Sequence, residues 1–334
     1  MQVYNGVEMN SFISAILRKG LNGEGINRET AEKIVDISGE DLWDLFSAAG
    51  KISRKFRGKE ISLCTIVNAR SGLCSEDCKF CAQSIHHKTD VDVYDIMSPQ
   101  IIVETAKDMD KAGADRFGIV TSGKGIGPKE MNAVLEAVSR VKKTTGLEVC
   151  ASLGVLSYEQ LVSLKEAGLT SYHHNIETAP SFYSTICSTH RYEERAETVR
   201  NAKRAGLSVC CGGIIGMGEN WSQRVEMAFA LRELNPDSIP INILNPVMGT
   251  PFENRPTTPP LEVLRTISLF RCVNPTKSIR YAGGREKNMN ELQAFGLVAG
   301  LDGMLTGNYL TTTGRNPEDD KRMIRNMGLD LKRG

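Results

Sequence analysis

The sequence predicts an α/β fold, a (β/α)8 TIM-type barrel preceded by an N-terminal helical extension. Beyond residue 58, short β-rich runs alternate with stretches of helical periodicity, which is the pattern of a parallel sheet covered by helices. Right-handed crossovers permit either an open sheet or a closed barrel, and eight strand–helix units favour the barrel. A chain of 334 residues has the length expected of such a barrel with an appended segment.

The first part of the chain is expected to be helical. Apolar residues recur at helical spacing through residues 9–57, and Asn10 or Asn27 is placed to cap a helix there. Because this stretch carries no metal-binding pattern, we expect a helical cap over residues 1–57 and a barrel domain over residues 58–334.

The barrel elements are expected in alternating order. The strands fall at 61–67, 116–121, 147–152, 171–175, 208–212, 238–243, 278–281 and 303–306. The helices fall between them, at 100–112, 128–144, 157–166, 192–204, 221–234, 260–272 and 290–298.

Composition narrows the classes of function. The net charge of +1 and the pI of about 7.5 indicate neither a nucleic-acid-binding nor a membrane-binding protein. The mean hydropathy is −0.25, no apolar run could span a bilayer, and the first residues lack the pattern of a secretory signal. We therefore expect a cytoplasmic protein whose nine cysteines serve metal or redox chemistry rather than disulfides.

A loop after the first expected strand carries three cysteines. Cys74, Cys78 and Cys81 are separated by three and then two residues, so one loop could wrap a metal cluster. Thiolates hold iron–sulfur clusters, and three of them leave one iron of a 4Fe–4S cubane open for a substrate or cofactor. The alternatives are a zinc knuckle, with His86 or His87 as the fourth ligand, and three unrelated buried cysteines.

Polar and sulfur-bearing residues also recur along the expected strands and at their ends. In (β/α)8 barrels the active site lies at the carboxyl ends of the strands. One such residue could simply satisfy backbone groups, but six in one chain indicate a common site. They are Cys150, Asn175, Glu177, Cys210, Asn242 and Arg280.

These motifs together resemble the radical S-adenosylmethionine (SAM) superfamily and, within it, the biotin synthase family. The cysteine loop, continued by Ala82-Gln83-Ser84, is shared by the superfamily, whereas the later motifs are specific to biotin synthases. They run in the family's order from about residue 60 to about residue 330 and comprise 173–178, 212–219, 240–242, 249–251, 280–286 and 306–312.

The resemblance implies a sulfurtransferase that converts dethiobiotin to biotin. Cys74, Cys78 and Cys81 would hold the 4Fe–4S cluster, and its open iron would chelate SAM. Reduction would cleave SAM to methionine and a 5′-deoxyadenosyl radical, which would abstract hydrogen from dethiobiotin; the cofactors carry this chemistry and the protein aims them. The resemblance also implies a reductant such as flavodoxin or ferredoxin, and a homodimer.

The resemblance assigns five residues to SAM. Phe80 would pack near the adenine, Glu177 would bind the ribose hydroxyls and Arg195 would pair with the carboxylate. Gly213 and Gly216 would let the backbone approach the nucleoside closely.

The resemblance also assigns residues to dethiobiotin. Asn175 would lie between SAM and the substrate, and Asn242 would hydrogen-bond the ureido ring, since an amide offers both a donor and an acceptor. His173 stands where the family usually has asparagine, so recognition of the substrate is expected to differ there.

The ligands of a second cluster depart from the family's pattern. In the family, three cysteines and an arginine hold a 2Fe–2S cluster that is the sulfur source. Cys150, Cys210 and Arg280 match three of these positions, but the fourth is Gly118, which has no ligand atom. Cys187, in the loop or short helix after the fourth strand, is the favoured substitute.

Cys150, Cys187 and Cys210 would suffice for a 4Fe-type second cluster with one open iron. This cluster is favoured over a 2Fe–2S cluster in which Cys187 replaces the missing ligand. Arg280, a catalytic candidate, would lie beside the cluster as a ligand or as a fixed positive charge. Since neighbours on a strand point to opposite faces, Cys210 should face inward and Cys211 outward. We expect three further cysteines to be small buried hydrophobic residues: Cys64, Cys211 and Cys272.

Two other functions remain open. Relatives with the same barrel act as maturation factors that assemble a metal cofactor for another protein, and an altered second cluster suits that function too. The other alternative is a structural module that binds zinc through the cysteine loop.

Overall fold

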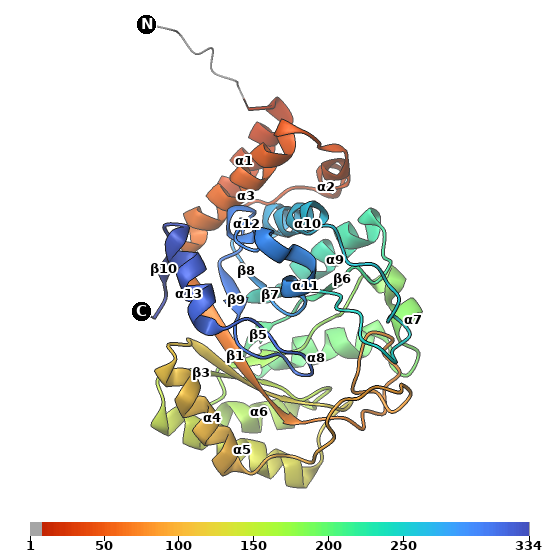
Figure 1. Cartoon of the computed structure of the whole chain (residues 1–334), viewed down its shortest axis with the longest axis vertical. Coiled ribbons are helices and arrows are strands. Elements are labelled where there is room, and N and C mark those ends of the chain that lie inside the picture. The colour runs from red at the N-terminus through yellow and green to blue at the C-terminus, as the bar shows by residue number, and fades with distance from the viewer. Residues whose placement is uncertain (1–8, 334) are drawn as a thin grey trace, which may run out of the picture.

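The computed structural model describes residues 9–333 and contains a closed ring of eight parallel strands. The ring closes because β9 pairs with β1 as well as with β8 (Figure 1). Its strands are β1 (Glu60–Arg70), β2 (Arg116–Thr121), β3 (Glu148–Ser152), β4 (Ser171–His173), β5 (Ser208–Cys210), β7 (Ser238–Ile243), β8 (Ser278–Tyr281) and β9 (Gly303–Leu305). The predicted (β/α)8 barrel is therefore confirmed.

One strand of the ring is interrupted. β5 ends at Cys210, and after two intervening residues β6 (Gly213–Ile215) resumes pairing with β7. The predicted strand 208–212 thus ends early, and the glycine-rich stretch that follows carries the chain toward the open end of the barrel.

Helices follow the strands around the outside of the ring. They are α4 (Pro99–Lys111), α5 (Pro128–Thr144), α6 (Tyr158–Glu166), α8 (Tyr192–Arg204), α9 (Trp221–Leu234) and α10 (Pro260–Val273). Side chains cap several of them, as at Ser98, Ser157 and Asn220, which each accept a hydrogen bond from a backbone N–H of the first turn.

The predicted helix 290–298 is wrong in part. The chain forms α11 (Arg285–Met289), a 3-10 turn η3 (Asn290–Leu292) and α12 (Phe295–Val298) instead. Asn290 adopts a positive φ of 44°, which separates α11 from η3, and only Phe295–Val298 of the predicted range is α-helical. The sequence analysis also omitted η1 (Ile34–Asp36), η2 (Pro180–Phe182), α7 (Tyr183–Ile186), α13 (Pro317–Asn326) and β10 (Asp330–Leu331).

The helical N-terminal region forms as expected. It contains α1 (Ser11–Leu21), α2 (Arg28–Lys33) and α3 (Glu40–Arg57), and both Asn10 and Asn27 cap helices. α3 packs against α10 and α12, so these helices cover one side of the barrel (Figure 1).

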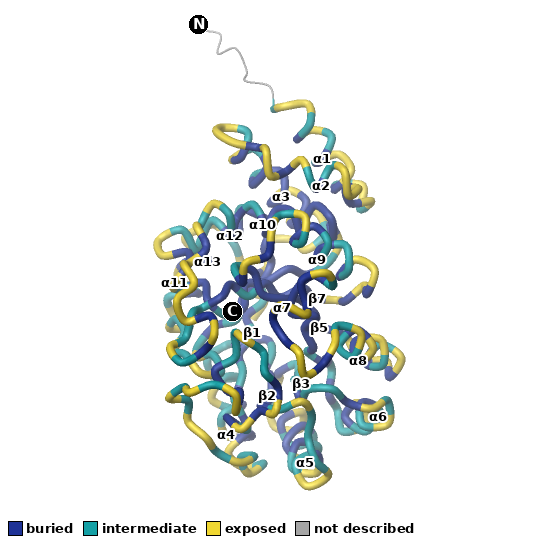
Figure 2. The backbone as a smooth tube through the Cα atoms, turned by 90° about the vertical axis from the view of Figure 1, so that its right-hand side faces the viewer, coloured by how far each residue is buried: buried dark blue, intermediate teal, exposed yellow. Residues whose placement is uncertain are grey.

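Strand β1 shows how the barrel presents residues to its interior. Leu63 and Val67 are buried under the outer helices, whereas Cys64 and Ile66 on the opposite face line a cavity. Buried residues concentrate on the strands and the inner faces of the helices, and exposed residues on the outer surface (Figure 2). Within residues 9–333, no helix is both long and apolar enough to cross a membrane.

Candidate active site

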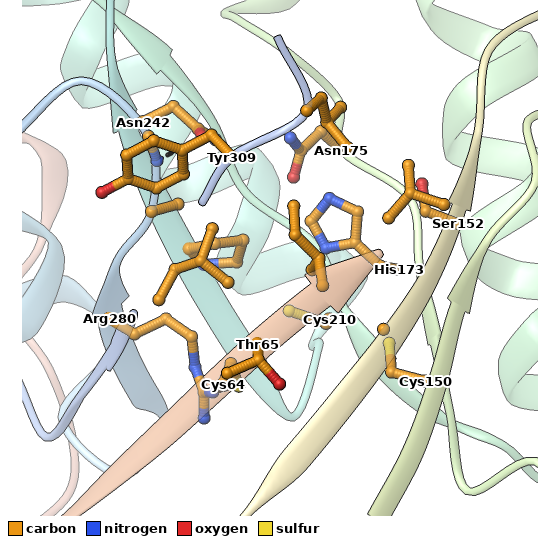
Figure 3. Close-up of a pocket in the computed structure, with 18 of the residues that line it drawn as sticks. Cys64, Thr65, Cys150, Ser152, His173, Asn175, Cys210, Asn242, Arg280 and Tyr309 are labelled. Carbon is orange, nitrogen blue, oxygen red and sulfur yellow. Dashed lines mark hydrogen bonds between the residues drawn. The ribbon is translucent and has the colours of Figure 1, made fainter. Parts of the chain in front are cut away.

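A cavity of about 370 Å³ occupies the inside of the barrel. Asn175, Asn242 and Tyr309 lie at one end of it, and the thiols of Cys64 and Cys150 lie at the other (Figure 3). The strand order explains this division. His173 pairs with Cys210, and Pro240 pairs with Arg280. Asn175 and Asn242 each follow two residues later, so they lie nearer the carboxyl ends of the strands.

The cysteine loop leaves the carboxyl end of β1 in a folded conformation. The N–H of Cys74 donates to the carbonyl of Gln83 at 2.9 Å, and the N–H of Cys81 donates to the carbonyl of Cys78 at 2.9 Å. Cys74 is buried, while Cys78 and Cys81 are partly exposed. Backbone hydrogen bonds therefore hold the loop in a defined fold, with one thiol buried and two partly exposed.

Two carboxylates between the cysteines anchor this loop to the segment after α7. Asp77 accepts hydrogen bonds from the N–H of Ser188 at 2.8 Å and from its hydroxyl at 2.5 Å. Glu76 accepts a hydrogen bond from Nδ1 of His190 at 2.5 Å, and both side chains are almost fully buried. The sequence analysis missed these anchoring residues, although two acids between three thiols were a usable signal.

Cys187 belongs to this same region. Its sulfur lies 3.7 Å from that of Cys78 and 3.2 Å from Nδ1 of His190. The hydrogen bond that the Cys78 thiol donates lowers the pKa of Cys187. Cys187 is absent from the cavity lining, so the expectation that it converges with Cys150 and Cys210 is not met. The reason is local: the end of α7 lies against the cysteine loop, where the N–H of Lys79 donates to the carbonyl of Ile186 at 2.9 Å.

The spacing of the loop thiols argues against a zinc knuckle. Four ligands at the Zn–S distance of about 2.3 Å would bring sulfurs to about 3.8 Å from one another. Among residues 9–333, the only set of three metal-binding side chains within 4.8 Å of one another is Cys78, Cys187 and His190, which includes one loop thiol. His86 and His87 hydrogen-bond to the carbonyls of Ser75 and Cys81. The three loop thiols are therefore farther apart than ligands of a single zinc ion would be. Such a spacing suits a cluster of several metal ions.

Next to the loop, Glu177 and Arg195 form a partly buried ion pair. Nη2 of Arg195 lies 2.6 Å from Oε1 of Glu177, and Nε donates to the carbonyl of Asn175 at 2.5 Å. Glu177 and Phe80 both line the cavity. The predicted SAM-binding residues Phe80, Asn175 and Glu177 are therefore close together, and Arg195 reaches the group through its contact with Glu177.

Glycine is required at the start of β6 and directly after it. Gly216 has a φ of 87°, and a Cβ on Gly213 would come within 2.6 Å of the carbonyl oxygen of Glu177. The carboxylate of Glu219 accepts the N–H groups of Gly216 and Met217, both at 2.8 Å. This backbone can therefore lie directly against Glu177.

The amide residues are held by the backbone around the cavity. Oδ1 of Asn242 accepts the N–H of Gly283 at 3.0 Å, and its Nδ2 donates to the carbonyl of Gly213 at 3.2 Å. Oδ1 of Asn175 accepts the N–H of Gly212 at 3.0 Å. Each amide keeps a fixed orientation toward the cavity and retains an N–H for a ligand.

A second group of thiols lies deeper in the barrel. Cys64, Cys150 and Cys210 line the cavity on three strands, and Arg280 on a fourth donates from Nη1 to the sulfur of Cys64 (Figure 3). Burial raises the pKa of Cys150 to about 12.

The other cysteines differ in outcome. Cys64, expected as a small buried hydrophobic residue, is partly buried and lines the cavity instead of packing in the apolar core. Cys211 and Cys272 are packed in the apolar core, as predicted.

His173 stands between the thiols and the amides. Its backbone pairs with Cys210 across β4 and β5, and its ring faces the cavity (Figure 3). Burial lowers the pKa of His173 to about 4, so the imidazole is neutral near pH 7.

Comparison with solved structures supports the fold alone. A crystal structure of methylornithine synthase covers 95% of this chain and 97% of its own, with a TM-score of 0.83 at 22% identity. The FeFe-hydrogenase maturase HydG from Carboxydothermus hydrogenoformans covers 95% of this chain and 78% of its own, with a TM-score of 0.81 at 17% identity.

Sequence comparison is far more specific. Residues 70–231 match the radical SAM superfamily, and residues 240–330 match the biotin and thiamin synthesis associated domain. The chain is 48% identical to a biotin synthase of Carboxydothermus hydrogenoformans, over 96% of this chain and 99% of the relative. It is 49% identical to a biotin synthase of Pelotomaculum thermopropionicum, over 95% and 98% of the two chains. With a three-cysteine loop whose Phe80 lines a cavity inside a parallel barrel, these matches show that the chain belongs to the biotin synthase family of radical SAM enzymes.

Proposed function

We propose that the chain converts dethiobiotin to biotin by inserting sulfur, with an iron–sulfur cluster in the barrel as the sulfur donor. One observation carries this proposal: a single cavity extends from Phe80 and Glu177, beside the cysteine loop, to Cys150 and Cys210 in the barrel interior. A substrate in this cavity lies between a site for radical generation and a site for a sulfur source.

Two sets of residues would hold the cofactors. Cys74, Cys78 and Cys81 would hold a 4Fe–4S cluster, and Glu177 with Arg195 would bind SAM beside it. When bound, these groups supply hydrogen abstraction and the sulfur atom, while the chain supplies position and exclusion of water. The Arg195–Glu177 ion pair supports a polar SAM site, because it fixes the carboxylate that would receive ribose hydroxyls.

The rest of the cavity would orient dethiobiotin. Asn175 and Asn242 would present amide groups to the ureido ring, since the surrounding backbone holds both in place. Apolar residues such as Ile66, Val120 and Ile214 line the same space and would keep water from the reacting carbons.

The nuclearity of the second cluster belongs to this proposal. We favour a 4Fe-type cluster, because three thiols from the barrel leave one iron without a thiolate; a 2Fe–2S cluster is the alternative. We also propose a cytoplasmic homodimer that receives electrons from a flavodoxin or a ferredoxin.

The alternative function as a maturation factor has weaker support. The likeness to HydG is one of fold, at 17% identity. The relatives at 48–49% identity are biotin synthases that match nearly the whole chain.

The decisive experiment is anaerobic turnover by reconstituted protein with SAM, a reductant and dethiobiotin. We expect biotin and 5′-deoxyadenosine from the wild type. Cys74→Ala, Cys78→Ala and Cys81→Ala should each abolish both products, and Cys272→Ala is the control for removal of a buried thiol. SAM cleavage without biotin under any condition would contradict the proposed substrate, and SAM cleavage by a loop variant would contradict the assignment of the first cluster.

A further inference from the structure

Arg280 is a buried cation without a carboxylate partner. The residue is 4% exposed, and its guanidinium donates to the hydroxyls of Ser238 at 2.9 Å and Ser278 at 3.2 Å, and to the sulfur of Cys64. No Asp or Glu within residues 9–333 forms an ion pair with it. A buried charge is costly unless an opposite charge lies beside it, so this position calls for an anion in the cavity.

Thiols are the groups available to supply that negative charge. Cys64, Cys150 and Cys210 come from β1, β3 and β5 and line one end of the cavity with Arg280 of β8 (Figure 3). Cysteine binds a metal as the thiolate, so a cluster held by these thiols would place negative charge beside Arg280.

The spacing of these sulfurs suits more than one metal ion. Cys64, Cys150 and Cys210 are not all within 4.8 Å of one another, because the only metal-binding set within that limit among residues 9–333 is Cys78, Cys187 and His190. Thiolates on one tetrahedral ion would be about 3.8 Å apart. At least one pair of these sulfurs is therefore farther apart than a mononuclear site would hold them.

The neighbouring strands explain why Cys64 can supply a ligand while residue 118 cannot. Ile66 of β1 pairs with Gly118 of β2. Cys64, two residues before Ile66 and on the same face of β1, pairs with Arg116. A Cβ on Gly118 would come within 3.0 Å of Cγ2 of Ile66. The Ile66 side chain thus occupies the space beside residue 118, and the thiol is carried by β1 instead.

We infer that Cys64, Cys150 and Cys210 are the three thiolate ligands of the auxiliary iron–sulfur cluster, with Arg280 beside it. The inference rests on the proposed function, which requires that cluster, and it assigns Cys64 as the ligand in place of Cys187. Cys187 stays with the cysteine loop.

Iron counting in a chain without the first cluster tests the inference. The background variant combines Cys74→Ala, Cys78→Ala and Cys81→Ala and is reconstituted anaerobically with iron and sulfide. Iron and sulfide per chain and Mössbauer spectra are then compared after adding Cys64→Ala, Cys187→Ala or Cys211→Ala. Cys211→Ala is the matched control, because it removes a fully buried thiol next to Cys210 that faces the core.

We expect Cys64→Ala to remove most of the residual iron, and Cys187→Ala and Cys211→Ala to leave it. Residual iron that is indifferent to Cys64→Ala, or lost with Cys187→Ala, overturns the inference alone. A background variant without any residual iron overturns the auxiliary cluster and therefore the proposed function.

Cys64→Ser guards against misfolding, since it preserves the size of the side chain and an acceptor for Arg280. In the background variant it should lower the iron content or change the Mössbauer parameters of the residual cluster. A folded Cys64→Ser variant with unchanged iron and spectrum overturns the inference. If both Cys64 variants also lose the first cluster in an otherwise intact chain, Cys64 is structural and the inference is likewise overturned.

Discussion

Glu177 adopts a backbone conformation that residues other than glycine seldom adopt. Its φ is 64°, and its carbonyl accepts the N–H of Ile214 at 2.7 Å. Such a conformation costs about 1–3 kcal/mol and persists where surrounding contacts enforce it, often at functional sites. Here it places the carboxylate against Arg195 and beside the cavity, which suits a residue that binds a cofactor.

This geometry predicts a division of roles between two ligands. Glu177→Gln should weaken SAM binding by about tenfold, because it removes the charged partner of Arg195 and weakens the contact to ribose hydroxyls. Asn242→Ala should leave SAM affinity nearly unchanged and weaken dethiobiotin binding by about 1–3 kcal/mol. Calorimetry or equilibrium dialysis with each ligand measures both; equal losses for both ligands in both variants would contradict this division.

Cys187 supports a different prediction. A thiol 3.7 Å from the sulfur of Cys78 can donate a hydrogen bond to it once that sulfur binds iron. Hydrogen bonds to cluster sulfurs raise the reduction potential. Cys187→Ala should therefore make the potential of the first cluster more negative, and Cys187→Ser should restore part of the shift. Anaerobic redox titration measures this, and an unchanged potential would show that the contact has no effect.

Cys64 and Cys187 show which features of the site the sequence could predict. Side chains alternate along β1, so Cys64 lies on the same face as Ile66 and Asn68. That Cys64 points into the barrel could therefore have been predicted from the sequence. The position of Cys187 could not, because it depends on how α7 and the turn before it fold back. The loop cysteines and the amides Asn175 and Asn242 were predictable, since a motif or a strand end fixes each of them.

At the level of the elements, the accuracy of the prediction differed from strand to strand. The strands 116–121, 238–243 and 278–281 were placed to the residue. The helix 290–298 was not, because the range begins with a 3-10 turn and only Phe295–Val298 is α-helical, a difference that apolar periodicity does not reveal. Short strands such as β4 and β5 ended early, since their length depends on pairing with neighbours that lie far away in the sequence.

A pH-dependent contact joins β1 to α5. Oε2 of Glu130 accepts the N–H of Gly127 at 2.7 Å, and Oε1 accepts a hydrogen bond from Arg70, the last residue of β1. Burial acts to raise the pKa of Glu130, but the hydrogen bonds from Gly127 and Arg70 outweigh it, so the pKa is lowered. A lowered pKa means that the folded state favours the charged carboxylate, so this stabilisation is present above the unfolded pKa of about 4.3.

Glu130→Gln should therefore lower the free energy of unfolding by about 1 kcal/mol at pH 7. The difference from the wild type should stay constant above about pH 5 and shrink as the pH falls below about 4, where the wild-type carboxylate takes up its proton. Urea unfolding of the cluster-free protein between pH 3.5 and pH 7 measures it. Thr105→Ala, which removes an exposed hydroxyl on α4, is the control and should show no pH dependence. A difference that grows toward low pH would contradict the assigned direction.

For the whole molecule, the N-terminal helices and the barrel share a buried charged centre. Asp302, just before β9, accepts from Nη2 of Arg271 at 3.1 Å and from the N–H of Ile279 at 2.6 Å. Its other oxygen accepts from Nε of Arg57, the last residue of α3, at 2.8 Å. Trp43 of α3 also packs edge-on against Phe295 of α12, with ring centroids 5.6 Å apart. These contacts indicate that the cap and the barrel unfold together, although they are separate along the sequence.

Two arginine variants test how this centre contributes. Arg271 is fully buried and also donates to the carbonyls of Gly300 and Lys277, so Arg271→Met should cost about 3–5 kcal/mol of unfolding free energy. The Arg57 side chain is 41% exposed, so Arg57→Met is the matched control and should cost less than about 1 kcal/mol.

Both tryptophans lie at the junction of the cap and the barrel. Trp43 packs against Phe295, and the indole N–H of Trp221 donates to the carbonyl of Ala31 in α2. Tryptophan fluorescence therefore reports release of the cap, and far-UV circular dichroism reports loss of the barrel. In urea the two signals should change together in the wild type and in both variants, because each of the helices α1, α2 and α3 packs against barrel helices. A fluorescence transition at lower urea than the dichroism transition would show that the cap is an independent unit, and equal costs for the two arginine variants would show that burial does not decide the strength of this centre.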